Sequence, residues 1–128
     1  MTLKPVRLLS VLAAISISTG CGSKEGQEPK LASTPAEAAG QMERAFAGAS
    51  AETRHAAEVA AEALRRGEYE KAVVSLTTVR AATNSTLEQG LAVHSSTLQL
   101  EARLATEIAA GNETAQRAYA PLKAMKAK

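Results

Sequence analysis

The chain has 128 residues and a formal net charge of +2, from 15 Lys and Arg against 13 Asp and Glu. Two of the basic residues, Lys4 and Arg7, lie in a segment that we expect to be removed, which leaves 13 basic against 13 acidic side chains. The apparent basicity therefore gives no indication of nucleic-acid binding. Every acidic residue is Glu, and the absence of Asp excludes Asp-dependent metal loops of the EF-hand type.

Residues 1–20 have the pattern of a secretion signal that ends at a lipid-attachment cysteine. A short basic start precedes a mostly apolar stretch, 8–17, that is too short to span a bilayer. The sequence STGC at 18–21 then resembles the lipobox of bacterial lipoproteins, although Ser18 stands where most lipoboxes have Leu. This resemblance implies that Cys21 is linked to diacylglycerol and becomes the first residue of the mature chain.

Two alternatives to lipidation stay open. One is an ordinary secretory signal that leaves Cys21 as a free thiol, and the other is a cytoplasmic chain with an apolar start. Cys21 is the only cysteine, so it has no intramolecular disulfide partner. If it is lipidated, the acyl chains hold the protein at a membrane, with about 0.8 kcal/mol for each buried methylene. Gly22 follows the cysteine where an Asp would retain a lipoprotein at the inner membrane. By resemblance to the enteric sorting rule, this favours the periplasmic side of the outer membrane.

Residues 21–33 are expected to form a flexible tether between the membrane and one folded domain, 34–128. The tether is rich in Gly, Ser, Lys, Glu, Gln and Pro, and Leu31 is its only large apolar residue, so it cannot bury enough surface to become ordered. The domain is long enough for one modest core. Alanine makes up about a fifth of the chain and Trp is absent, so we expect close packing and modest stability.

The first of four expected helices begins at the sequence TPAE, 34–37, which provides a cap, a first-turn proline and an acidic residue. This helix is expected to continue to Arg66, before Gly67. Gly40 and Gly48 are expected to weaken or interrupt its first part, because each glycine lowers helix stability by about 1 kcal/mol relative to Ala. A stripe of mostly small residues at alternating four- and three-residue steps favours close helix–helix approach. It consists of Met42, Phe46, Ala49, Thr53, Ala56, Ala60 and Ala63.

A second helix is expected at about 68–82 and a fourth at about 113–126. The second ends before Asn84, and its apolar face is expected to contain Val73, Val74, Leu76 and Val79. Pro121 is expected to kink or split the fourth helix, because proline lacks the backbone donor of its turn. The apolar side of the fourth helix consists of Tyr119, Leu122 and Met125.

The third helix is expected at about 86–110, behind a capping box at 85–88. Its large apolar residues fall on two overlapping stripes, so this helix should contact neighbours on two sides. They are Leu87, Leu91, Leu98, Leu100, Leu104 and Ile108. No segment alternates as a strand would. The sequence therefore predicts an all-α domain of about four helices in antiparallel hairpins.

The turn between the first two expected helices resembles the central turn of a tetratricopeptide repeat. In that family a Gly closes the first helix, an aromatic residue follows two positions later, and a small Ala begins the packing face of the second helix. Here these are Gly67, Tyr69 and Ala72. A second copy around Gly111 and Tyr119 is weaker, and the two turns are further apart than the family's repeat. The resemblance implies a protein-binding module, and the alternative is a small helical bundle with one convergent turn.

Candidate catalytic and metal-binding residues are few, and we predict no enzyme, no metal site and no cofactor. Glu52 and His55 share one helical face, but a di-iron bundle needs a second such pair, and His94 lacks the matching glutamate. Ser95 and Ser96 adjoin His94, but consecutive helical residues point in different directions and cannot by themselves form a nucleophile–base pair.

Two classes of function remain. The favoured one is a membrane-anchored, non-enzymatic helical module that binds a protein partner in the cell envelope, with its packing or binding surface at Gly67, Tyr69, Ala72 and Tyr119. The alternative is a structural envelope lipoprotein that associates with itself through the stripe at 42–63. No nucleic-acid partner is expected in either case.

The lipid anchor is tested by Cys21→Ala. Because this variant lacks the sulfur to which diacylglycerol is linked, we expect it to leave the membrane fraction while its helical circular dichroism is unchanged. Ser23→Ala, two positions further on, is the matched control and should stay with the membrane. Tight membrane association of Cys21→Ala would contradict the lipoprotein interpretation.

Overall fold

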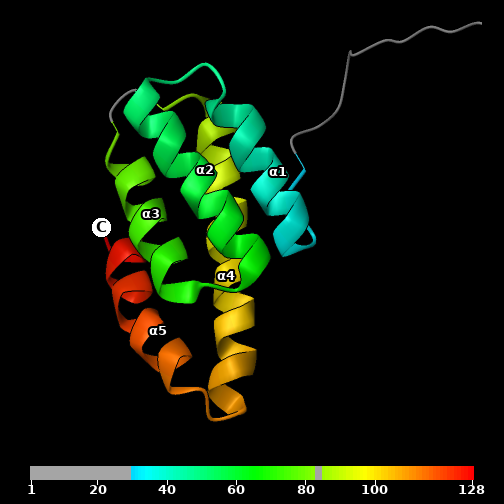
Figure 1. Cartoon of the computed structure of the whole chain (residues 1–128), viewed down its shortest axis with the longest axis vertical. Helices are drawn as coiled ribbons and strands as arrows, with labels where there is room; N and C mark the ends of the chain where they lie inside the picture. Colours follow the sequence, from blue (N-terminus) through cyan, green and yellow to red (C-terminus); the bar gives the residue numbers. More distant parts are fainter. Residues whose placement is uncertain (1–29, 83–84) are drawn as a thin grey trace, which may run out of the picture.

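The computed structural model describes residues 30–82 and 85–128, and this part of the chain is all-helical, with no strand (Figure 1). The predicted all-α helical bundle is confirmed, with one helix more than expected. The signal segment 1–20, Cys21 and Asn84 lie outside the described residues. The helices are α1 (Pro35–Phe46), α2 (Ala51–Arg66), α3 (Tyr69–Ala81), α4 (Leu87–Ala109) and α5 (Glu113–Lys126).

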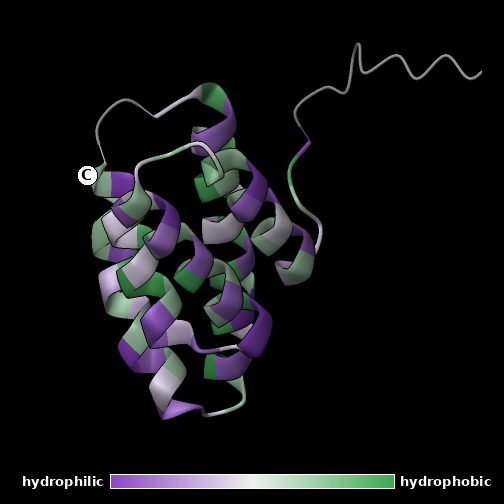
Figure 2. Ribbon diagram, turned by 45° about the horizontal axis from the view of Figure 1, so that its top comes forward, coloured by the Kyte–Doolittle hydropathy of each residue, from purple (hydrophilic) through white to green (hydrophobic). Residues whose placement is uncertain are grey.

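Three of the helices, α1, α3 and α5, pack against α4, which is the longest, and α2 packs against α1 and α3. Successive helices run in opposite directions, and α1, α2 and α3 lie side by side in chain order (Figure 1). Helix α4 contacts α1 and α3, and α5 packs against both α3 and α4. Figure 2 shows hydrophobic and hydrophilic residues alternating around the helices, as expected when each helix buries one face.

The core consists largely of alanine, as the composition predicts. Eleven of the 21 buried apolar residues are Ala, and these small side chains allow the helices to approach closely. Larger side chains fill the remaining space between the helices. The largest that are fully buried are Phe46, Met42, Leu76, Leu100, Leu104 and Leu122.

The prediction of one helix from 34 to 66 is wrong, because the chain breaks between α1 and α2. Thr34 caps α1 as expected, but a second cap occurs at Ser50, whose Oγ accepts a hydrogen bond from the backbone N–H of Thr53 at 3.3 Å. Gly48 lies in the break, where its poor helix propensity favours interruption. A new N-cap and a nearby glycine therefore outweigh the continuous apolar pattern.

This break also changes the stripe at 42–63. Helices α1 and α2 pack against each other, so the two halves of the stripe face the core instead of forming one external seam. Met42, Phe46, Ala60 and Ala63 are at most 1% exposed. Ala49, Thr53 and Ala56 are partly buried, so the folded domain offers no continuous exposed seam along this stripe.

Three local predictions differ from the structure. The capping box at α4 pairs Thr86 with Gln89, one position later than expected, because Gln89 also reaches the backbone N–H of Thr86. Val74 does not belong to the apolar face of α3 and is 64% exposed. Pro121 does not split α5, which continues through it. Because Pro121 and the preceding turn at Arg117 are exposed, water can bind the carbonyl that lacks its donor.

The segment 30–33, which the sequence assigns to the flexible tether, packs against the domain. The backbone N–H of Ala32 donates to Ser95 Oγ at 3.2 Å, and the Ala32 carbonyl accepts from Gln99 Nε2 at 2.9 Å. Ala32 itself is buried in the core. Composition does not predict this contact, because α4 side chains bind the backbone of the segment and only the small Ala32 side chain is buried with it.

The predicted turn at Gly67 is confirmed. Gly67 ends α2 in the left-handed region with φ +70°, and Glu68 donates its N–H to the Ala63 carbonyl at 2.9 Å. We expect Gly67→Val to lower the free energy of unfolding by more than about 1 kcal/mol, because a β-branched residue is strained at positive φ. Chemical denaturation measures the change.

Gly90→Ala is the matched control for Gly67→Val. Gly90 is helical and a Cβ there would meet nothing within 4 Å, so alanine should stabilise α4 by about 0.5–1 kcal/mol. Equal unfolding curves for Gly67→Val and the natural chain would show that the turn does not need the left-handed conformation.

An ion pair joins α1 to α2 and gives a pH-dependent contribution to stability. Arg65 donates to both Glu43 oxygens at 2.6 and 2.7 Å, and these hydrogen bonds lower the pKa of Glu43 below its ordinary value of 4.5. The stabilisation is therefore fully present above the unfolded pKa and is lost as pH falls through the lowered folded pKa.

We expect Glu43→Gln to destabilise the protein at neutral pH by less than about 1 kcal/mol. The value is small because both side chains are more than one-third exposed and water screens the pair. Urea unfolding measured across the acidic range should show the difference disappear once Glu43 is protonated in the natural chain. A difference that persists at low pH would rule out the carboxylate as its cause.

Candidate binding surface

The residues that the sequence selects as a packing or binding surface belong to the turn and the core. Gly67 forms the turn and Ala72 is fully buried. Tyr69 is half-buried and packs against the core, and this burial, together with the nearby Glu107 carboxylate, raises the pKa of its hydroxyl. Tyr119 also packs against the core, and Lys123 Nζ lies 5.7 Å from its ring centre. These four residues hold helices together and do not form one exposed surface.

The candidate chemical groups are placed apart from one another. His55 on α2 and His94 on α4 are both exposed, and no group of three or more potential metal-ligating side chains occurs in the described residues. Ser95 and Ser96 are fully buried, and Ser95 Oγ accepts the hydrogen bond from Ala32. Neither serine is therefore accessible to a substrate.

An exposed apolar stripe on α4 is the first component of a candidate binding surface. Leu87, Leu91, His94 and Leu98 follow one another at steps of four, three and four, which places them on one helical face. Leu87 is 83% and Leu98 36% exposed, and Leu91 is partly exposed. We call these four residues the leucine stripe.

Only one of the two stripes predicted on this helix packs against the domain. Leu100 and Leu104 are fully buried, and Ile108 is partly buried against the core. Helix α4 does contact more than one neighbour, namely α1, α3 and α5, but Leu87 and Leu98 are not covered by any of them. The leucine stripe thus presents apolar side chains to solvent on the helix that organises the fold.

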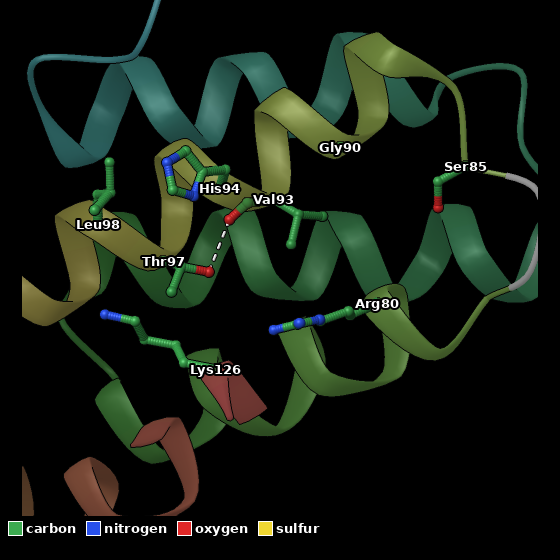
Figure 3. A pocket seen from close by; sticks show the side chains of 8 residues that line it. All are labelled: Arg80, Ser85, Gly90, Val93, His94, Thr97, Leu98 and Lys126. Carbon is green, nitrogen blue, oxygen red and sulfur yellow. Dashed lines mark hydrogen bonds between the residues drawn. The ribbon is translucent and has the colours of Figure 1, made fainter. Parts of the chain in front are cut away.

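A groove beside the leucine stripe is the second component. Helix α5 has 14 residues and α4 has 23, so α5 is shorter by about 13 Å and covers only part of the seam between α3 and α4. Beyond the end of α5 a hollow of about 440 Å³ opens between the three helices (Figure 3). His94 and Leu98 line it as well, so the groove and the stripe form one continuous surface.

The polar groups of this groove are mainly basic. Arg80 Nη1 donates to the Met125 carbonyl at 2.6 Å, and Lys126 Nζ donates to Glu101 at 2.7 and 2.9 Å. Lys126 is therefore neutralised by a carboxylate, whereas Arg80 forms no ion pair within the described residues. None of the described residues that line the hollow is acidic. The groove consequently combines an uncompensated guanidinium with the apolar side chains of Val93 and Leu98.

Sequence reasoning missed Arg80 and Lys126 as a pair. Each lies in the last turn of its helix, where a basic residue is ordinarily explained by the helix dipole. The packing of α3 against α5 brings the two ends to one groove, and no sequence motif indicates this. The leucine stripe, in contrast, is visible in the sequence as one of two apolar patterns on a single helix.

Comparison with known proteins adds no relative. No family model, no curated protein and no solved structure matches the chain. The tetratricopeptide resemblance therefore stays a prediction that rests on the residues around Gly67. In the part of the chain that the structure describes, no helix is both long and apolar enough to cross a membrane.

Proposed function

We propose that the protein is a membrane-anchored, non-enzymatic module that binds a helical segment of a protein partner in the cell envelope. The leucine stripe carries this proposal. Its four-three-four spacing matches the pattern by which helices interlock their side chains, and amphipathic helices commonly dock on such surfaces. An exposed apolar row on a folded domain indicates an interaction site more often than an isolated exposed leucine does.

The energy available from the stripe suits a reversible contact. Full burial of a leucine side chain contributes about 1.5–3 kcal/mol, and association loses part of this gain to the entropy of the two partners. Leu87 has the most area left to bury, whereas Leu98 is already more than half covered. The stripe alone therefore supports modest affinity, which a common membrane location strengthens by raising the local concentration.

The proposed anchor and the docking surface meet on the same helix. Ala32 is held by Ser95 and Gln99 of α4, so the chain departs toward Cys21 from a fixed point on the helix that carries the leucine stripe. The nine residues from 21 to 29 span at most about 30 Å when extended. If Cys21 is lipidated, the stripe stays close to the membrane surface, and we place its partner there, on the periplasmic side of the outer membrane.

Self-association through α4 is a second candidate. A stripe of this spacing can pack against the same stripe of a second copy, for example in an antiparallel pair. A two-fold dimer uses the same surface on both copies in this way. This candidate replaces the stripe at 42–63, of which four residues are buried and three partly buried in the domain. The two candidates differ only in what covers Leu87 and Leu98.

The proposal is tested by photo-cross-linking in the cells that make the protein. A photoreactive amino acid replaces His94 in the full chain, and we expect a discrete adduct whose partner is identified by mass spectrometry. Adding Leu98→Gln should abolish the adduct, because an amide in the stripe cannot be buried without a hydrogen-bond cost. Its own effect on stability should stay within about 1 kcal/mol, since Leu98 is one-third exposed.

Val74→Gln is the matched control for Leu98→Gln, because Val74 is an exposed apolar residue on α3 outside the stripe. It should leave the adduct unchanged. Adducts to one hetero-partner support the proposed module, and adducts only to a second copy support self-association. An adduct that survives Leu98→Gln, or the absence of any adduct, would contradict both.

A further inference from the structure

We propose that the groove beside the leucine stripe binds a glutamate- or aspartate-bearing position of the partner helix, and that Arg80 recognises this carboxylate. The inference rests on the proposed function, because it specifies the chemistry of the segment that covers the stripe. It concerns a separate set of contacts, however, since Arg80 lies on α3 and the stripe on α4.

The place of the groove favours a peptide that lies along α4. The hollow begins where α5 ends and continues the seam between α3 and α4, so a segment bound there extends the line of α5. His94 and Leu98 belong to both the hollow and the stripe. A helix seated on the stripe therefore places some of its side chains directly over the groove.

The charge of the groove favours acidic side chains at the positions of the bound helix that lie over it. Figure 3 shows Arg80 and Lys126 extending from two different helices into the space beside Thr97. Glu101 compensates Lys126 through two hydrogen bonds, while Arg80 has no carboxylate partner in the described residues. An entering carboxylate therefore meets a free positive charge and no acidic residue of the lining.

Arg80 is also positioned in advance. Its hydrogen bond to the Met125 carbonyl, at 2.6 Å, occupies one Nη atom and fixes the guanidinium at the mouth of the groove. The planar guanidinium has further N–H donors that can bind a carboxylate at the same time. Because the side chain is already held, less conformational entropy is lost when a ligand binds.

The apolar part of the groove favours an acidic peptide over a free anion. Val93 and Leu98 line the same hollow as Arg80, so the ligand that fits best offers a carboxylate next to apolar side chains. An amphipathic helix with glutamates beside its leucines has this combination. An anionic lipid headgroup offers the charge without adjacent apolar side chains, and the vesicle experiment below distinguishes it from a peptide.

The test uses two short synthetic helical peptides with leucines at four-three-four spacing. One has glutamates beside the leucines, and the matched peptide has glutamines at the same positions. Binding to the full chain, purified from membranes in detergent, is measured by fluorescence anisotropy at low and high salt. We expect the glutamate peptide to bind about tenfold more tightly at low salt, as for one charge-assisted contact, and salt should reduce this preference.

Arg80→Gln should remove the preference, and Arg80→Lys should retain part of it because the charge remains. Arg117→Gln is the matched control, since Arg117 is an exposed arginine that pairs with Glu70 away from the groove. It should leave the preference intact. Because Arg80→Gln also removes a contact to α5, His94→Glu is a second variant that keeps this contact and adds a carboxylate beside the groove. It should reduce the preference for the glutamate peptide, because the added carboxylate repels glutamate and not glutamine.

The outcomes separate this inference from the proposed function. Equal binding of the two peptides, both lost in Leu98→Gln, would overturn the role of Arg80 and leave the docking stripe standing. A preference that survives both Arg80→Gln and His94→Glu would overturn the assignment to this groove. Binding of neither peptide overturns both proposals. Arg80-dependent binding to phosphatidylglycerol vesicles without peptide binding would assign the groove to lipid instead.

Discussion

The fold depends on the burial of one face of α4. Ala92, Leu100 and Leu104 on this face are almost completely excluded from solvent, and α1, α3 and α5 all pack against the helix. The extended segment at 30–33 adds a fourth contact through the backbone of Ala32. No described helix covers the opposite face of α4, and the shorter α5 leaves part of one flank uncovered. The candidate surface is thus a consequence of helix arrangement and unequal helix length and needs no separate structural element.

An alanine-rich core allows close helix packing, and from it we expect modest stability. Each buried alanine removes little apolar area from water, so stability comes from many close contacts instead of a few large side chains. Three consecutive polar residues of α4, Ser95, Ser96 and Thr97, are also buried. Thr97 donates to the Val93 carbonyl and Ser95 accepts from Ala32, whereas Ser96 Oγ has no partner among the described residues. In such a core we expect substitutions that introduce strain to lower the free energy of unfolding by a large fraction of its total.

Local signals in the sequence predict most of the secondary structure. Gly67 marks the end of α2 because only a residue tolerant of positive φ fits there, and the limits of α3, α4 and α5 agree with expectation within one residue. The sequence identifies Gly48 as an interruption but not the reversal of the chain there, because a regular apolar pattern continues across the break. Val74 and Leu87 are missed because periodicity identifies apolar residues without showing whether a neighbour exists to cover them. The groove is beyond local prediction, since Arg80 and Lys126 meet only through the packing of α3 on α5.

The hydrogen bond from Arg80 to Met125 relates the fold to recognition. It satisfies a carbonyl in the last turn of α5, at the point where the groove begins. A lysine ammonium at this position is a point charge on a flexible stem, whereas a guanidinium can bind the carbonyl with one nitrogen and a second acceptor with another. An acidic partner can therefore bind without releasing the end of α5. In the proposed complex the bound carboxylate and the Met125 carbonyl hold the guanidinium from two sides, so partner binding would also stabilise the contact between α3 and α5.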